Sequence, residues 1–233
     1  MKTAIPLWSW PSVPVAGSDS TFPVRRIFCV GRNYADHARE MGHDPTREPP
    51  FFFTKPADAV VSESGKDGIV AVRYPLMTQN LHHEVEMVVA LQGGGENLRA
   101  EDTPALIFGY AVGLDLTRRD IQGKAKEKGH PWDMGKGFDQ SAPISAIVPA
   151  SVCGHPASGA VTLTVNGDMK QQGDLAQMSW KVPEVIAELS RYVKLAPGDL
   201  IFTGTPAGVG PVVVGDQLVA SVAGVADLKV RLV

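Results

Sequence analysis

Short apolar runs separated by glycine, proline and other turn residues recur along the chain, and most have the length of a β-strand. The clearest run spans residues 81–91, and Gly93-Gly94-Gly95 ends it. Residues 161–165 alternate between apolar and polar, and the Asn166-Gly167 dipeptide after them is typical of a two-residue hairpin turn. Similar patterns predict further strands at residues 26–31, 51–56, 107–114, 199–203, 217–223 and 225–233.

Helical patterns are fewer. The best amphipathic pattern is formed by Val182, Val185, Ile186, Leu189 and Val193, which recur at helical spacing. The charged residues 117–129 predict a second helix, and residues 33–42 predict a short third one with Asn33 as its N-cap. The first 22 residues are rich in proline and serine and predict an irregular arm. Since no repeat, low-complexity block or linker divides the remainder, we expect an N-terminal arm over residues 1–23 and a single domain over residues 24–233.

Composition narrows the classes of protein that fit. The chain has 233 residues, 44% hydrophobic and 20% charged, and a formal net charge of −3, which argues against intrinsic disorder and against a nucleic-acid partner. The 24 glycines and 18 prolines favour a β-rich fold over a helix bundle. No run approaches the roughly 18 apolar residues of a membrane span. The N-terminus does not have the pattern of a signal peptide, and the isolated Cys29 and Cys153 form no disulfide framework, so we expect a cytoplasmic protein without a membrane partner.

The strongest chemical signal is the segment His82-His83-Glu84-Val85-Glu86. Side chains alternate along a strand, so Glu84 and Glu86 project to the same face and repel each other unless a positive charge lies between them. Asp115 closes the buried run 107–114 and needs a partner in turn. Hard oxygen ligands of this kind suit Mg²⁺, Mn²⁺ or Ca²⁺ rather than zinc. The alternatives are a solvated strand face for the two glutamates and a helix N-cap for Asp115.

Two further segments carry weaker signals. His37 and Glu40 are i, i+3 neighbours on the predicted short helix, where they could act as a general base and its orienting acid or simply form an exposed pair. The glycine-rich residues 203–210 could bring backbone N–H groups near an anion or form a tight turn between strands, and they lack the Gly-Lys-[Ser/Thr] of a nucleotide-binding loop. The polar residues beside apolar or glycine-rich stretches could each be surface residues when taken singly: Lys55, Arg119, Gln122 and Lys136.

Taken together and in this order, these pieces closely resemble the fumarylacetoacetate hydrolase family. The resemblance runs from about residue 24 to the C-terminus and is carried by four segments. They are Val30-Gly31-Arg32-Asn33-Tyr34-Ala35-Asp36-His37, His82-His83-Glu84-Val85-Glu86, Gly113-Leu114-Asp115-Leu116-Thr117-Arg118-Arg119-Asp120 and Gly204-Thr205-Pro206-Ala207-Gly208-Val209-Gly210. Within the family, residues 42–53 are similar to bacterial fumarylpyruvate hydrolases of gentisate breakdown.

The resemblance implies a mixed α/β, β-rich fold, a mixed β-sandwich roll with a few short helices, and usually a homodimer. It implies Mg²⁺ or Mn²⁺, with Ca²⁺ also possible, held by Glu84, Glu86 and Asp115. His37 would activate water on a lid and Glu40 would orient it. The remaining matches to family positions are Lys136 as a catalytic lysine and Lys55, Arg119, Gln122 and Thr205 as substrate-binding residues.

The activity that the resemblance implies is metal-dependent hydrolysis of a carbon–carbon bond in a 1,3-diketo acid. We expect 3-fumarylpyruvate as the substrate and fumarate and pyruvate as products. The same metal site would also serve an acylpyruvate hydrolase, an oxaloacetate decarboxylase or a keto–enol isomerase, because all of them stabilise a pyruvoyl enolate. A non-catalytic protein that binds small acids or metal is a further alternative, and the complete set of matching residues argues against it.

Overall fold

The computed structural model describes residues 3–35, 48–63 and 68–233. Its β-strands are β1 (Ser12–Pro14), β2 (Thr21–Pro23), β3 (Arg26–Gly31), β4 (Phe51–Lys55), β5 (Val60–Val61), β6 (Ile69–Val72), β7 (Leu81–His83), β8 (Val85–Leu91), β9 (Ile107–Leu114), β10 (Thr117–Arg118), β11 (Ala142–Pro143), β12 (Val148–Pro149), β13 (Ala160–Val165), β14 (Asp168–Asp174), β15 (Asp199–Phe202), β16 (Gly210–Val212), β17 (Gln217–Val222) and β18 (Ala226–Leu232). Its α-helices are α2 (Arg119–Lys128), α3 (Asp133–Lys136), α4 (Ala150–Cys153) and α5 (Val182–Leu189), and its 3₁₀ helices are η1 (Ala57–Ala59), η2 (Ala100–Leu106) and η3 (Leu175–Gln177). The expected mixed, β-rich class is confirmed.

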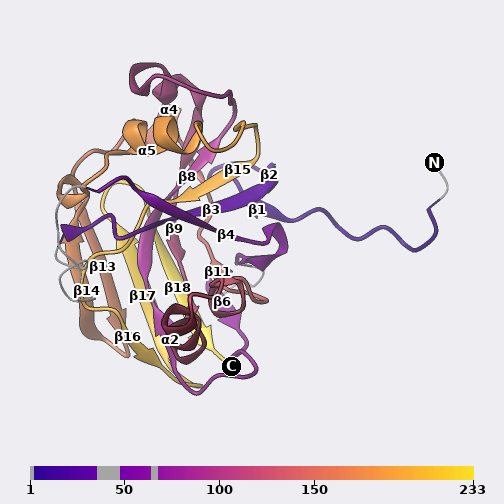
Figure 1. Ribbon diagram of the computed structural model, residues 1–233, viewed down its shortest axis with the longest axis vertical. Helices are drawn as coiled ribbons and strands as arrows, with labels where there is room; N and C mark the ends of the chain where they lie inside the picture. Colours follow the sequence, from indigo (N-terminus) through magenta and orange to yellow (C-terminus); the bar gives the residue numbers. More distant parts are fainter. Residues whose placement is uncertain (1–2, 36–47, 64–67) are drawn as a thin grey trace.

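Two large sheets form the body (Figure 1). A six-stranded sheet has the order β12-β9-β8-β15-β3-β4, and a five-stranded sheet has the order β14-β13-β17-β18-β6. Strand β15 runs parallel to β3 and antiparallel to β8. The ends of β3, β9 and β15 therefore lie at one edge of the six-stranded sheet, together with the start of β8, since β8 and β9 are also antiparallel.

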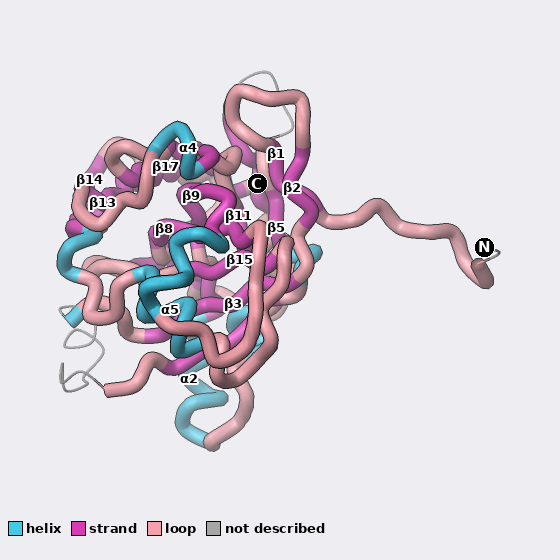
Figure 2. The backbone as a smooth tube through the Cα atoms, turned by 90° about the horizontal axis from the view of Figure 1, so that it is seen from above, coloured by secondary structure: helices cyan, strands magenta, loops and turns pink. Residues whose placement is uncertain are grey.

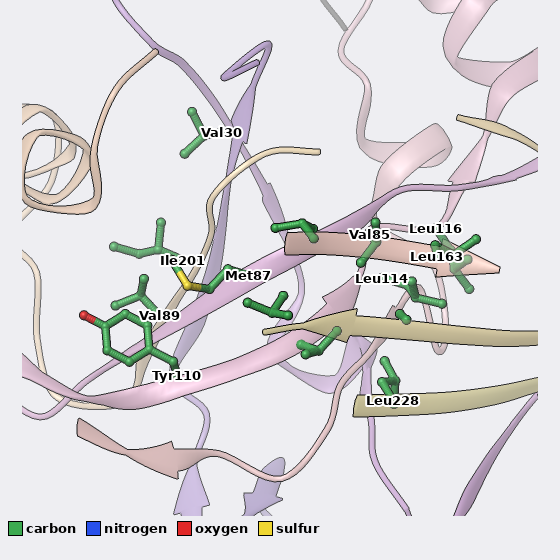
Figure 3. Close-up of a cluster of buried hydrophobic side chains, with 14 of the residues drawn as sticks. Val30, Val85, Met87, Val89, Tyr110, Leu114, Leu116, Leu163, Ile201 and Leu228 are labelled. Carbon is green, nitrogen blue, oxygen red and sulfur yellow. The ribbon is translucent and has the colours of Figure 1, made fainter. Parts of the chain in front are cut away.

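The main hydrophobic core lies between the two large sheets (Figure 3). Strand β8 contributes Val85, Met87 and Val89 to it, and β13 and β18 contribute Leu163 and Leu228 from the opposite sheet. Helix α5 also packs its apolar face on this core, as its helical spacing predicts. Burial of these side chains, at about 25 cal/mol per Å² of apolar surface, stabilises the packing of the two sheets.

The opposite face of the six-stranded sheet is buried as well. Val88 and Ala90 alternate with the residues of the main core and pack into a second cluster with Val13, Phe22 and Phe202. Because both faces are covered, the central strands are apolar at nearly every position, which explains their continuous runs in the sequence.

The N-terminal residues differ in part from the predicted irregular arm. Strands β1 and β2 form an antiparallel hairpin, and Val13 is fully buried in the second cluster. Residues 3–11, which precede this hairpin, have no helix or strand and extend away from the body (Figure 2). The alternation in such short strands is too brief to distinguish from an irregular proline-rich segment. The division of the chain at residue 24 stays a prediction.

The run over residues 81–91 is not one strand. It breaks at Glu84 into β7, which pairs with β10 and β16, and β8, which joins the six-stranded sheet. At the break the Asp115 backbone N–H donates to the Glu84 carbonyl oxygen at 2.9 Å. The chain thus passes from one sheet to another at the first acidic residue of the motif.

Other expected elements agree closely with the structure. The 166–167 turn joins β13 and β14, and its residues have positive φ values of 53° and 89°, as a type I′ hairpin requires. Helix α5 ends at Leu189, one turn before Val193. The short strands β6 and β16 were not predicted. Among the described residues, no helix is long and apolar enough to cross a membrane.

Candidate active site

Three buried carboxylates meet where β8 begins and β9 ends. Each of Glu84, Glu86 and Asp115 offers an oxygen, and these oxygens all lie within 4.8 Å of one another. Their residues are no more than 5% exposed. Glu86 is the second residue of β8, Glu84 lies at the break just before this strand, and Asp115 comes directly after β9. The expected clustering of these three acids is therefore found.

Two lysines neutralise part of this negative charge. Lys136, at the end of α3, places Nζ 2.8 Å from Glu84 Oε2 and 2.6 Å from Asp115 Oδ2. Lys55, at the end of β4, places Nζ 2.8 Å from Asp115 Oδ1 and donates to the carbonyl oxygens of Leu116, at 3.1 Å, and Lys136. Both lysine side chains are buried, so they are held in the low-dielectric interior only because the carboxylates pair with them.

Arg119 and Gln122 approach the same acids from the first turn of α2. Arg119 Nη2 lies 2.5 Å from Glu84 Oε1, and Arg119 Nη1 donates to Gln122 Oε1 at 2.6 Å. His82 Nδ1 lies 3.4 Å from Arg119 Nε, and Asn80 Oδ1 lies 2.9 Å from His82 Nε2. Burial and the Arg119 charge lower the pKa of His82 to about 4, so this imidazole is neutral at pH 7 and can accept from the guanidinium.

The charges leave a strong demand for a cation at Glu86. Burial, with Asp115 and Glu84 nearby, raises the pKa of Glu86 well above its ordinary range. Burial by itself lowers the pKa of Lys136, but the Asp115 and Glu84 carboxylates outweigh this effect and raise it. Asp115 Oδ1 accepts no hydrogen bond from the described residues despite its short distance to Lys55. Three buried carboxylates whose oxygens lie within 4.8 Å of one another fit a hard divalent cation, so the triad is placed to bind a metal ion.

The glycine-rich loop after β15 closes the other side of the site. The Gly204 backbone N–H donates to Glu86 Oε2 at 2.7 Å, and Thr205 lines the cavity above the acids. Gln171 of β14 holds this loop, because its Nε2 donates to Thr205 Oγ1 and to the Pro206 carbonyl, both at 2.8 Å. The Gln171 Oε1 atom accepts from the Val85 backbone N–H at 3.1 Å. One buried amide thus connects the loop with the strand that carries Glu86.

These groups line one cavity that is partly open to solvent. Its polar floor consists of the metal triad with Arg119, Gln122, Lys136 and Thr205. The other lining residues that bear on substrate binding are Arg32, Phe51, Phe53, Lys126 and Trp132. Lys55 is absent from the lining and reaches the site through Asp115. The cavity is therefore acidic and charge-paired at its floor and aromatic and basic at its wall and rim.

The structure brings together eight of the ten residues that the sequence indicated. His37 and Glu40 lie outside the described residues. Sequence reasoning did not single out Arg32, Phe51, Trp132, His82 or Gln171. Arg32 and His82 stood inside motifs but gave no signal of their own. Gln171 carries no sequence signal, because it is one inward-pointing residue in an otherwise exposed polar strand.

Comparison with known proteins identifies the class to which this site belongs. The family model described as fumarylacetoacetate (FAA) hydrolase C-terminal matches residues 26–233. The chain therefore belongs to the fumarylacetoacetate hydrolase family, as its motifs indicated. It is a metal-dependent enzyme of a family of hydrolases that act on carbon–carbon bonds.

Individual relatives carry two kinds of activity in their names. A crystal structure of fumarylpyruvate hydrolase from Pseudomonas aeruginosa, in complex with Mn²⁺ and pyruvate, is 49% identical, has a TM-score of 0.96 and aligns over 100% of this chain and 99% of its own. A fumarylpyruvate hydrolase of Ralstonia sp is 44% identical over 81% of this chain and 95% of its own length. Oxaloacetate tautomerase FAHD1 of Bos taurus is 40% identical over 89% of this chain and 91% of its own length.

Proposed function

We propose that this enzyme hydrolyses 3-fumarylpyruvate to fumarate and pyruvate with Mg²⁺ or Mn²⁺ as its cofactor. The observation that carries the proposal is a single cavity in which the carboxylate triad faces Arg119, Gln122, Lys136 and Thr205. The similarity over the full length to a fumarylpyruvate hydrolase crystallised with Mn²⁺ and pyruvate supports the same substrate and metal. The proposal includes a cytoplasmic homodimer without nucleic-acid or membrane partners.

Glu84, Glu86 and Asp115 would hold the divalent ion, and Ca²⁺ would fit the same oxygen ligands. When bound, this ion supplies Lewis-acid stabilisation of negative charge on the pyruvoyl end of the substrate. Thr205 lies beside the acids, where its hydroxyl can donate to the substrate carboxylate. Lys55 pairs with Asp115 Oδ1 at 2.8 Å and so holds this carboxylate in place from behind the cavity.

Hydrolysis requires water to add to the ketone carbon distal to the pyruvoyl group. In the proposal His37 takes the proton from this water and Glu40 orients the imidazole. The oxyanion that forms lies within reach of Lys136 or of the pair Arg119 and Gln122, whose N–H donors line the cavity. The bond between this carbon and the methylene then breaks, its electron pair goes to the methylene carbon as the pyruvate enolate, and protonation of that carbon gives pyruvate.

Lys136 is suited to this role because one of its N–H groups remains available for the oxyanion. Its ammonium has three donors, and two of them point to Glu84 and Asp115 at 2.8 and 2.6 Å. The raised pKa keeps Lys136 charged, so it donates and does not accept a proton at neutral pH.

Keto–enol tautomerisation of oxaloacetate is the second candidate. It is favoured by the 40% identity to an oxaloacetate tautomerase and by the 41% identity to the YcgM tautomerase of Escherichia coli. The reaction moves one proton and needs no nucleophilic water. The metal triad serves both reactions, so the difference must lie in the groups that activate water and in the space for the acyl group.

The test is a spectrophotometric assay of fumarylpyruvate with Mn²⁺ or Mg²⁺, run beside acetylpyruvate and the enol form of oxaloacetate. We expect loss of the fumarylpyruvate absorbance with formation of one fumarate and one pyruvate, and abolition by EDTA. Glu84→Gln should lower kcat/KM at least a hundredfold. The matched control is Glu127→Gln on the exposed face of α2, which should leave the rate unchanged.

The outcomes separate the candidates. Tautomerisation of oxaloacetate without cleavage of any diketo acid would replace the hydrolase proposal by the second candidate. Full turnover by the Glu84→Gln variant would overturn the metal assignment for both. His37→Ala should abolish hydrolysis while the Mn²⁺ affinity stays the same.

A further inference from the structure

The rim of the cavity presents a cationic side chain that the proposed reaction leaves without a task. We propose that Arg32 binds a carboxylate at the far end of the acyl group, so that the enzyme selects planar acylpyruvates that end in an acid. This inference rests on the proposed function and names the substrate class of the same site.

The backbone holds Arg32 at the edge of the cavity. It is the first residue after β3, and its φ of 61° lies in the left-handed region that few arginines adopt. The next residue, Asn33, is 1% exposed and is held by its side-chain amide, which donates to the carbonyls of Trp180 and Thr203 at 2.9 and 2.8 Å. Its Oδ1 also accepts from the Trp180 backbone N–H at 2.8 Å. Such an unfavourable conformation persists only where neighbouring contacts enforce it, and it is commonest at functional sites.

An aromatic wall lies between Arg32 and the charged floor. Phe51 and Trp132 meet edge to face with ring centroids 5.0 Å apart, and Phe53 lies 6.0 Å from Trp132. Phe51 can take this place because residue 31 is glycine: a Cβ there would lie 2.2 Å from the Phe51 ring. A wall of rings suits a flat, conjugated acyl group, since stacked π-systems gain contact area without hydrogen bonds.

The distribution of charges in the cavity indicates that the ligand of Arg32 is an anion. The Arg119 and Lys136 cations pair with Glu84 in the floor. The Arg32 guanidinium lies 5.9 Å from the Phe51 ring centroid and, among the residues described, has no carboxylate within ion-pair distance. A guanidinium with its planar donors exposed binds a carboxylate in bidentate fashion, which an ammonium cannot do.

The decisive comparison is between fumarylpyruvate and crotonylpyruvate, which differ only by a terminal carboxylate against a methyl group. The principal variant is Arg32→Asn, because asparagine tolerates the left-handed backbone and the fold should be kept. We expect kcat/KM for fumarylpyruvate to fall by about ten- to a hundredfold, mainly through KM, as for loss of a hydrogen bond to a charged group. For crotonylpyruvate the fall should be less than threefold.

Two further variants sharpen the result. Arg32→Lys keeps the charge without the bidentate geometry. Its kcat/KM for fumarylpyruvate should lie between that of the wild type and that of Arg32→Asn. The control is Arg231→Ala on the exposed side of β18, outside the cavity, which should leave both substrates unaffected. Equal losses for both substrates would overturn the inference, because Arg32 would then serve the pyruvoyl end or the fold. An unchanged kcat/KM of Arg32→Asn for both substrates would also overturn the inference.

A binding measurement keeps the inference separate from the proposed reaction. Titration of the Mn²⁺-loaded enzyme with fumarate and with crotonate requires no turnover. We expect fumarate to bind at least tenfold more tightly than crotonate in the wild type and equally in Arg32→Asn. If no diketo acid is cleaved but this preference is present, the proposed function fails and the acid-binding role of Arg32 stands. If hydrolysis occurs but fumarate and crotonate bind equally, the proposed function stands and the acid-binding role of Arg32 fails.

Discussion

Glu86 is almost completely buried and has two carboxylates for neighbours, so its charge is costly in the metal-free protein. Its pKa is raised above the ordinary value of 4.5 by burial and by Asp115 and Glu84. Between that ordinary value and the raised one, the folded protein binds more protons than the unfolded chain. Its stability therefore falls as the pH rises through this window, and a bound cation reverses the effect.

Replacement of Glu86 by glutamine should separate the cost of the buried charge from the stabilisation by the bound cation. In EDTA at pH 7 we expect the Tm of Glu86→Gln to equal or exceed that of the wild type, because the amide keeps an acceptor for the Gly204 N–H and carries no charge. Saturation with Mn²⁺ should raise the wild-type Tm by about 5–10 °C, corresponding to about 2.7 kcal/mol at a hundred times Kd, and leave the variant unchanged. Calorimetry at pH 5 and pH 8, in EDTA and with Mn²⁺, measures these Tm values. A rise in Tm with Mn²⁺ that is equal in the variant and the wild type would contradict the prediction.

Gln171 is predicted to position the site although no sequence motif contains it. The change to leucine removes the acceptor of the Val85 N–H and the donor to Thr205, leaving buried polar groups unpaired at about 1–3 kcal/mol each. We expect the Tm to fall by about 5–10 °C and kcat/KM to fall at least tenfold. Gln172→Leu, at the exposed neighbouring position, is the matched control and should change the Tm by less than about 1 °C. Equal effects of the two substitutions would refute the role of Gln171.

At the scale of elements, the site depends on how closely β8, β9 and β15 pack. Gly113 lies directly opposite Glu86 in the register of β8 and β9. A Cβ at this glycine would lie 2.5 Å from Phe202 and 2.7 Å from Val88, both in the second cluster. The absence of a side chain at residue 113 therefore lets β15 pack beside the strand that carries the metal ligand.

Gly113→Ala should consequently destabilise the protein by about 1–3 kcal/mol through overpacking and weaken Mn²⁺ binding, because the neighbours of Glu86 must move. Gly123→Ala on α2 makes the opposite test, since nothing lies within 4 Å of the added Cβ. That change should raise stability by about 0.4–1 kcal/mol and leave Mn²⁺ binding unaffected. Urea unfolding and Mn²⁺ titration of both variants check the pair, and stabilisation by Gly113→Ala would contradict the packing argument.

The break between β7 and β8 shows where local patterns mislead. Residues 81–91 look like one strand because each half is apolar, yet the chain changes sheet at Glu84. The backbone at that point forms its hydrogen bond with Asp115, a residue that local periodicity cannot connect to it. The break thus links Glu84 to Asp115 through a backbone hydrogen bond. The alternation of side chains alone did not predict this link.

At the scale of the whole molecule, the N-terminal segment divides at about residue 11. Residues 3–11 extend from the body with Leu7 and Trp8 largely exposed, whereas Val13 and Val24 are fully buried. Deletion of residues 1–10 should change the Tm by less than about 2 °C. Deletion of residues 1–24 removes four buried apolar side chains at about 1.5–3 kcal/mol each, comparable with the whole free energy of unfolding, so the product should not fold.

Circular dichroism melting of the two deletion variants is the measurement. A native Tm after removal of residues 1–24 would show that residues 25–233 fold independently of the hairpin. A large loss after removal of residues 1–10 would show instead that the exposed arm packs against a second copy of the chain.

The sequence by itself determined much of the local structure: most of the buried strands, the 166–167 hairpin and helix α5. Backbone periodicity and turn chemistry act over a few residues, so they can be read without the fold, and the ordered motifs indicated the family. Only the tertiary structure decided how Lys136 reaches Glu84 across 52 residues and how Gln171 reaches His83 across 88. It also assembled the aromatic wall beside Arg32, because such contacts depend on the packing of distant segments.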